Sequence, residues 1–409
     1  MTPSPALSKN PLPALYGGAP AFREKFRFIS PKLPILDDVL VGYTPCFRDG
    51  IITNAKCVSR FEEAAAEYIG VRHCVAVSSC TSGLMLVMKA LGLKGEVILP
   101  SFTFFATAHA ARWNSLRPVF ADCDTDTWNI DSADIEKKIT PRTSAIVAVH
   151  MYGNPNDVRR LEKLAANHGL KLIFDAAHAF GSRRQKEPIG QFGDAEVFSL
   201  SPTKLLVAGE GGLIATNNPD LAAALRIMRN YGDSGSYDPE WIGLNARMPE
   251  FNAALATAGI PLLDEKVARR NEIARLYTDG LRGLPGITFQ KVDERDTHTF
   301  KDFSIHIAGE QFGLTRDQLA QALLAENVET KRYFYPPLHK QRHYRDYFDS
   351  PLPGTDWVAD NILSLPIYET LSDDTVKTII ECIHLIHSFA AHRSLDSQQM
   401  ESSYVLESH

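Results

Sequence analysis

Seven short apolar runs alternate with helix-like segments between residues 73 and 216, and this alternation constrains the fold more than any other feature of the chain. Strands buried on both faces of a parallel sheet read as continuous runs of Val, Ile and Phe, because neither face meets water. The segments between the runs carry apolar residues at helical spacing. The pattern therefore predicts an α/β fold, with a mainly parallel, mixed sheet between two layers of helices. The expected strands are residues 73–77, 96–99, 118–121, 145–150, 171–175, 196–200 and 212–216.

After Gly232 the pattern changes, and a chain of 409 residues is long enough for a second, smaller domain. Its expected elements are a long helix over residues 249–281, a strand over 304–308 and helices over 315–326 and 372–389. Together they predict a smaller α+β domain. The predicted organisation is an N-terminal arm over 1–44 that contributes to the small domain, a large domain over 45–260, the small domain over 261–390 and a polar, disordered tail over 391–409.

Composition excludes several classes of protein. Forty-three Lys and Arg against forty-nine Asp and Glu leave a net charge of −6, so no broad basic surface is present to bind nucleic acid. The apolar runs are far shorter than the roughly 20 residues that a bilayer helix needs. The first sixteen residues lack a basic start followed by an apolar run, so we expect a cytoplasmic protein without a membrane partner. The six cysteines form no CxxC pair, and neither a zinc site nor a disulfide framework is expected.

The most informative motif is the run from Ile173 to Gly181, in which an apolar strand ends at Asp175. Burying a lone carboxylate costs free energy, so this one is expected to face a cation or a protonated ring nitrogen. A helix cap or an ordinary ion pair at a strand end would explain the same residue.

The second motif places Lys204 in a turn between two apolar strands, followed by Gly209, Gly211 and Gly212. Buried surroundings disfavour the ammonium form and make such an amine a nucleophile, whereas an isolated lysine is more often solvated. Asp175 and Lys204 together are the pair that pyridoxal phosphate needs. The amine forms a Schiff base, and the carboxylate keeps the pyridine nitrogen protonated so that the ring accepts electrons.

Two further motifs suit the rest of such a cofactor. After the strand at 73–77, the hydroxyls of Thr81 and Ser82 stand at the start of a helix, where free N–H groups can bind a phosphate. Ser and Thr are also common as simple helix caps. After the strand at 96–99 follow several aromatic residues, of which Phe104 can stack on a flat ring or pack in the core.

With these motifs at this spacing, the chain resembles the DegT/DnrJ/EryC1/StrS family of pyridoxal-phosphate aminotransferases over nearly its whole length, from Ile52 to His339. The resemblance implies the fold type I architecture of aspartate aminotransferase. It implies an enzyme, a transaminase, that moves an amino group from glutamate or glutamine to a keto sugar, nucleotide-linked in many members, or to a related cyclic ketone such as a cyclitol.

Carried over position by position, the resemblance makes Lys204 the Schiff-base lysine and Asp175 the partner of the pyridinium. His178 falls near the cofactor's phenolic oxygen, and Phe104 on the face of its ring. Thr81, Ser82 and Ser199 fall around the phosphate.

The segment from Gly243 to Met248 resembles the family's GYNYRM stretch, from which the second subunit of a homodimer reaches the phosphate. Asn245 is the expected contact there, and Arg247 is the alternative. Leu244 and Ala246 replace the two usual aromatic residues. His339 resembles a position that lines the substrate entrance.

Other functions remain open on sequence alone. In the family's dehydratases a histidine replaces the lysine, and Lys204 argues against that reaction. A regulatory or binding protein that keeps the fold without turnover is a further alternative, because a fold does not guarantee an activity. The segment Leu15 to Pro20 resembles branches that act on cyclitols and other non-nucleotide ketones.

Overall fold

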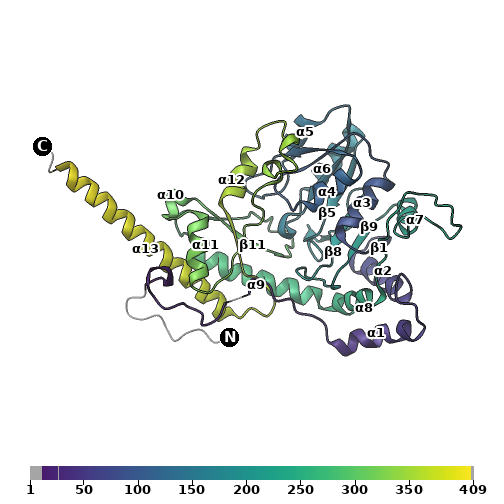
Figure 1. Ribbon diagram of the computed structural model, residues 1–409, viewed down its shortest axis with the longest axis horizontal. Helices are drawn as coiled ribbons and strands as arrows, with labels where there is room; N and C mark the ends of the chain where they lie inside the picture. The colour runs from purple at the N-terminus through teal and green to yellow at the C-terminus, as the bar shows by residue number, and fades with distance from the viewer. Residues whose placement is uncertain (1–11, 26, 407–409) are drawn as a thin grey trace.

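A seven-stranded sheet forms the centre of the protein in this computed structural model, which describes residues 12–25 and 27–406, with side chains up to residue 391 (Figure 1). The strand order is β1-β9-β8-β5-β4-β2-β3. β9 is antiparallel to both of its neighbours, and the other adjacent pairs inside the sheet are parallel. The strands are β1 (His73–Val77), β2 (Glu96–Pro100), β3 (Arg117–Ala121), β4 (Thr143–Val149), β5 (Lys171–Asp175), β8 (Ala195–Ser199) and β9 (Gly212–Thr216), and β6 (Arg183–Arg184) pairs with β7 (Glu187–Pro188) in a separate hairpin. All seven predicted strands of the main sheet are present, and their bounds shift by at most two residues.

Helices cover both faces of this sheet. The helices are α1 (Leu36–Arg48), α2 (Lys56–Ile69), α3 (Cys80–Ala90), α4 (Ala106–Trp113), α5 (Ser132–Lys138), α6 (Val158–His168), α7 (Pro219–Met228), α8 (Glu250–Gly259), α9 (Leu263–Leu281), α10 (Gly309–Phe312), α11 (Arg316–Ala325), α12 (Pro353–Asn361) and α13 (Asp373–Leu406). Buried side chains of α2, α6 and α8 belong to one apolar core, and those of α3, α4 and α7 to another. The two cores lie on opposite faces because successive side chains of a strand alternate: in β4, Ile146 and Ala148 belong to the first core, and Ala145 and Val147 to the second.

A second, antiparallel sheet of β10 (Ile287–Phe289), β11 (Phe303–Ile307) and β12 (Ile362–Leu365) lies in a separate apolar core with α9, α11 and α13. Ala21 and Phe22 from the N-terminal arm belong to that core. Helix α9 joins the two parts, since Val267 belongs to the core of the large sheet and Ile273 to that of the small sheet. The predicted domain bounds at 44/45 and 260/261 stay predictions, and residues 1–11 of the predicted arm lie outside the described part.

Two sequence expectations differ from the structure. The helix expected over 249–281 is split, because α8 ends at Gly259 and a short 3-10 turn, Ile260–Leu262, precedes α9. Pro261 lacks the N–H that a continuous helix requires there. The tail expected to be disordered from residue 391 continues α13 as helix to Leu406. Neither Gly nor Pro occurs after residue 372, so nothing in the backbone stops the helix. Residues 407–409 of that tail lie outside the described part.

The parallel strands direct their carboxyl ends to one edge of the large sheet. Asp175 is the last residue of β5 and Ser199 the last residue of β8, while Gly212 begins the antiparallel β9 at the same edge. Ligands of open α/β sheets bind outside this edge. In the described part of the chain, no helix is long and apolar enough to span a bilayer.

Candidate active site

Asp175 lies at the centre of the edge and is 5% exposed. Its Oδ2 accepts a hydrogen bond from the Thr107 hydroxyl at 2.7 Å, and its Oδ1 accepts one from the Ala177 N–H at 3.1 Å. Burial raises the pKa of this carboxyl, and the two hydrogen bonds oppose that rise. Within residues 12–25 and 27–391, Asp175 makes no ion pair. The site therefore holds a buried carboxylate without a cationic partner among the described residues.

Lys204 follows β8 in the loop that returns to β9 and is half-buried. Its backbone N–H donates to Ser201 O at 3.0 Å, but no described residue forms a hydrogen bond or ion pair with its amine. Burial, and next the positive charge of Lys301, lower the pKa of Lys204 to about 8, against the opposing charges of Asp302 and Asp175. The lowered pKa enlarges the uncharged share of this amine near neutral pH, and the uncharged form is the nucleophile.

His178 lies three residues beyond Asp175 and is buried. Its Nδ1 accepts a hydrogen bond from the Tyr152 N–H at 3.2 Å. Burial, together with the charges of Lys204 and Lys301, holds its pKa well below the usual range, so the ring is neutral. Because Nδ1 accepts, the proton sits on Nε2, which is left as a donor. The Phe334 ring is nearly parallel to this imidazole, with 6.1 Å between centroids and 10° between planes.

The start of α3 lies beside Asp175, since the Cys80 thiol is 3.9 Å from Asp175 Oδ1. Ser79 caps the helix by accepting the Ser82 N–H at 3.1 Å, and the Ser82 hydroxyl donates to Ser79 O at 2.8 Å. Ser82 is thus the third residue of a capping box in which Ser79 is the N-cap. The hydroxyl of Thr81 has no hydrogen-bond partner among the described residues. The N–H groups of Cys80 and Thr81, in the first turn, have no acceptor within the helix.

Two glycines bring the sheet close to this helix start. A Cβ on Gly212 would lie 2.5 Å from Ser79 C, and a Cβ on Gly83 would lie 2.8 Å from a methyl of Val197. Only a residue without a side chain permits these approaches. Ser199, paired with Gly212 in the sheet and half-buried, is therefore held near the N-terminus of α3.

Phe104 is 46% exposed and lies against Phe105, with 3.9 Å between ring centroids. Both rings line a cavity of about 670 Å³ whose wall also contains Lys331, Arg332 and residues 333–336. Phe104 is 6.0 Å from Phe334, the ring parallel to the His178 imidazole. The cavity thus opens beside the residues described above.

Asn245 and Arg247 differ in their surroundings. Arg247 donates to Asn230 Oδ1 at 2.8 Å and lies over the Tyr231 ring, so its guanidinium is engaged within its own chain. Asn245 is exposed, and none of the described side chains bonds its amide. Of the two, Asn245 is free to contact another molecule.

Sequence reasoning missed several residues of this site. Thr107 bonds Asp175, and Lys301, which is 5% exposed, binds Asp302 through both carboxylate oxygens at 2.8 and 3.1 Å. A Lys-Asp pair directly before a strand was the available signal, since buried charges occur in pairs.

The expectation for His339 was wrong. It is 4% exposed and bonded to Ser101 and Asp356, so it fixes the loop that follows and does not line the entrance.

The residues present fit pyridoxal phosphate. An unpaired buried carboxylate suits the protonated ring nitrogen, and an unbonded amine with a lowered pKa suits the aldehyde. Free N–H groups at the start of an eleven-residue helix suit the phosphate.

Comparisons with known proteins agree with this geometry. The family described as the DegT/DnrJ/EryC1/StrS aminotransferase family matches residues 41–384. The dTDP-4-amino-4,6-dideoxy-D-glucose transaminase of Escherichia coli is 34% identical over 86% of this chain and 96% of its own length. The UDP-N-acetyl-3-dehydro-alpha-D-glucosamine 3-aminotransferase of Acidithiobacillus ferrooxidans is also 34% identical, over 86% of this chain and 94% of its own. The crystal structure of DesI with its TDP-sugar product superposes with a TM-score of 0.88 at 37% identity, covering 95% of this chain and 99% of that one.

Proposed function

Since the chain belongs to the DegT/DnrJ/EryC1/StrS family of pyridoxal-phosphate-dependent aminotransferases, we propose that it transfers an amino group from glutamate or glutamine to the ketone of a nucleotide-linked sugar. The predicted fold class, enzyme class and cofactor are confirmed by this membership. The observation that carries the proposal is the placement of Lys204 and Asp175 in one buried site, close enough for each charge to change the pKa of the other.

A nucleotide-linked sugar is supported by the relatives, which are named for dTDP- and UDP-linked sugars. The cavity of about 670 Å³ beside Phe104 supports the same class. Its aromatic rings suit a stacked base, and Lys331 and Arg332 at its wall suit a diphosphate.

When bound, pyridoxal phosphate supplies an aldehyde carbon to which amines add and a ring that withdraws electrons from the carbon bearing the amine. Lys204 would hold the cofactor through its Nζ. When the Nζ is free, it would accept and return the proton of the amino donor's α-carbon. A pKa of about 8 suits this work, because the amine both accepts and returns a proton near neutral pH.

The remaining residues of the site would orient the cofactor and hold it in place. Asp175 keeps the proton on the ring nitrogen, and Thr107 and the Ala177 N–H fix the carboxylate in the plane it needs. His178 donates from Nε2 to the phenolic oxygen, because the Tyr152 N–H fixes the tautomer. Phe104 would stack on the ring, and Thr81, Ser82 and Ser199 would hold the phosphate together with the first N–H groups of α3.

We propose a homodimer in which Asn245 of each chain completes the site of the other. Support comes from exposed apolar side chains on α1 and the loop after it, among them Val41 at 77% and Phe47 at 66% exposure. An apolar face of this kind on a folded chain favours association. The six unpaired thiols support a cytoplasmic, reducing location.

The proposal is tested with a panel of keto sugars and cyclitols, nucleotide-linked and free, incubated with ¹⁵N-labelled glutamate or amide-labelled glutamine. We expect a nucleotide-linked product in which the ketone oxygen is replaced by a labelled amino group. A product that has instead lost a hydroxyl would indicate dehydration. Colour without any spectral response to an amino donor would indicate a binding protein.

The shared site has its own test. Chains with Lys204→Ala and chains with Asn245→Ala are each expected to be weak, and mixed dimers of the two are expected to regain activity, because one site of each mixed dimer contains both native residues. Mixed dimers without any regain would contradict the contribution of Asn245 across the interface.

A further inference from the structure

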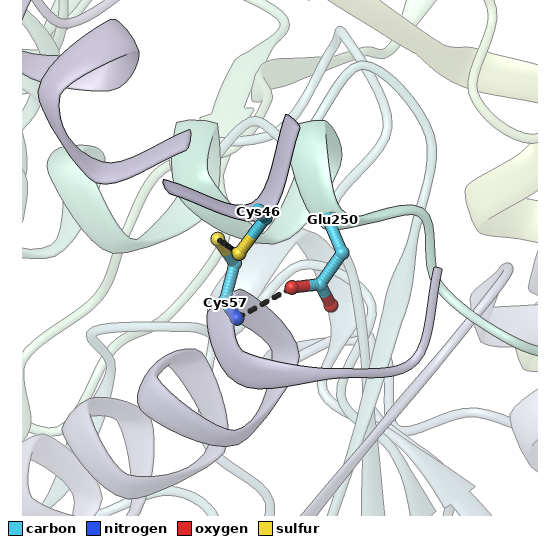
Figure 2. Close-up of side chains that lie close together, drawn as sticks. All are labelled: Cys46, Cys57 and Glu250. Atoms are coloured by element: carbon cyan, nitrogen blue, oxygen red, sulfur yellow. Dashed lines mark hydrogen bonds between the residues drawn. The ribbon is translucent and has the colours of Figure 1, made fainter. Parts of the chain in front are cut away.

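Two cysteines outside the active site lie within bonding reach of each other. Cys46 is in the last turn of α1, and Cys57 is in the first turn of α2, eleven residues later. Their Sγ atoms are 3.0 Å apart, and both side chains are buried (Figure 2). The bond length of a disulfide is about 2.05 Å, so an approach of about 1 Å would close one.

The same cluster does not suit a metal ion. Glu250 is the third group, and ligand atoms of all three residues lie within 4.8 Å of one another. Its carboxylate already accepts backbone N–H groups of Ala55 at 2.7 Å, Cys57 at 2.6 Å and Val58 at 3.2 Å, which caps the start of α2. Two thiolates on one tetrahedral zinc ion would be about 3.8 Å apart, given Zn–S bonds of about 2.3 Å. At 3.0 Å the sulfurs are too close for that role.

A link at this place would fasten a helix that has few fully buried residues. Of the thirteen residues of α1, only Val39 and Cys46 are buried, and Pro45 interrupts its hydrogen bonding. The loop after α1 pairs with the segment that follows Asn245: Asn54 N–H donates to Met248 O at 3.1 Å. The loop that joins the two cysteines therefore contacts the chain segment that carries Asn245.

Cys57, although buried, borders a cavity. It lines a cavity of about 610 Å³ formed by α1, α2, α8 and the segment before α1. Much of the lining is apolar, for example Leu33, Ala254 and Pro261, which admits a small uncharged oxidant more readily than a charged one.

We propose that Cys46 and Cys57 are a redox pair, which hydrogen peroxide closes into a disulfide that fastens α1 to α2. The Cys57 thiolate attacks one peroxide oxygen, the O–O bond breaks, and the departing hydroxide takes a proton and leaves as water. Cys46 sulfur then attacks the sulfenic sulfur of Cys57, and the hydroxyl leaves with the Cys46 proton as a second water. The two thiols lose two electrons and two protons in all, and one peroxide is reduced to two waters.

The rate of this closure depends on pH. Burial, the hydrogen bond with Cys46 and the charge of Glu250 raise the pKa of Cys57 to about 12. Below that pKa the thiolate fraction rises about tenfold for each pH unit, and the thiolate is the reactive form. We expect the disulfide to form about ten times faster at pH 8 than at pH 7.

Peptide mass spectrometry of the peroxide-treated holoenzyme tests the proposal. The enzyme is treated with peroxide, unfolded in iodoacetamide and digested with trypsin, which cleaves after Lys32, Arg48, Lys56 and Arg60. We expect residues 33–48 joined to residues 57–60, two hydrogens lighter than the sum of the free peptides. The pair is expected to separate again after dithiothreitol treatment, and the link is expected to raise the Tm reversibly.

Control variants show which cysteines form the disulfide. Cys46→Ser is expected to abolish it, while Cys382→Ser, which removes a buried thiol of the small-sheet core, is expected to leave it unchanged. Alkylation of both thiols after peroxide treatment would overturn the proposal, as would oxidation of Cys57 without a link. Elemental analysis that finds one zinc per chain, lost with Cys46→Ser, would overturn it in favour of a metal site. If disulfide formation left the Tm unchanged, the proposed fastening of α1 would be overturned.

Discussion

Lys204→Met is expected to stabilise the apo-protein while abolishing its activity. The pKa of Lys204 falls from 10.5 to about 8 because the folded chain buries the amine and places Lys301 near it. At about 1.36 kcal/mol per pKa unit, the folded state carries a penalty of about 3 kcal/mol whenever the amine is charged in both folded and unfolded chains. The half-buried position of Lys204 leaves part of its charge solvated, so this figure is an upper bound.

The dependence on pH follows from the sign of the shift. Below pH 8 the folded and unfolded chains both hold the proton, and the whole penalty is present. Between pH 8 and 10.5 the folded chain gives up its proton first, so wild-type stability rises and the advantage of the variant shrinks. The gain of Lys204→Met is therefore expected at pH 7 and is expected to be largely lost at pH 10.

Urea unfolding of both apo-proteins at one protein concentration measures the difference. Cofactor is removed beforehand with hydroxylamine, so that bound cofactor does not stabilise the wild type. Lys94→Met, which replaces an exposed lysine, is the control and is expected to change the free energy of unfolding by less than about 0.5 kcal/mol. A Lys204→Met apo-protein no more stable than wild type at pH 7, or a gain that is equal at pH 7 and pH 10, would refute the reasoning.

Four further variants test the surroundings of the cofactor. Asp175→Asn is expected to keep bound cofactor but to lower kcat by roughly 100- to 1,000-fold, because an amide does not hold the proton on the ring nitrogen; a kcat within tenfold of wild type would count against that role. Thr81→Val is expected to raise the Kd for the cofactor, whereas Ser82→Ala is expected chiefly to lower stability, by about 1 kcal/mol, because its hydroxyl loses the capping-box hydrogen bonds with Ser79. Titration with cofactor and urea unfolding of both variants would expose any reversal. Lys301→Met removes the charge that lowers the pKa of Lys204. In wild type the rate of cofactor binding to the apo-protein is expected to increase through pH 8, and in the variant this increase is expected to shift to higher pH. A pH profile that does not shift would contradict the electrostatic link between the two lysines.

The sequence predicted the large sheet well because its signal is local. Each strand is a short apolar run with a turn at its end, and β1, β5 and β9 have the predicted bounds. Asp175 and Ser199 were predictable as neighbours for the same reason, since the carboxyl ends of parallel strands share one edge of a sheet.

The rest of the site depends on packing between distant segments. Lys301 and Asp302 directly precede β11 of the small sheet, and no local pattern places their charges beside Lys204. Ser82 was assigned to the phosphate, but local hydrogen bonding to Ser79 competes for its hydroxyl. Cys46 and Cys57 belong to two helices whose meeting depends on Glu250, almost two hundred residues later.

Reduction of the holoenzyme with borohydride, followed by peptide mapping, tests the central claim most directly. Reduction fixes the cofactor to whichever amine holds it. The structure predicts one cofactor mass per chain, on the tryptic peptide that contains Lys204, and none in Lys204→Ala. Cofactor attached at another lysine, or an unlabelled Lys204 in a yellow and active enzyme, would contradict it.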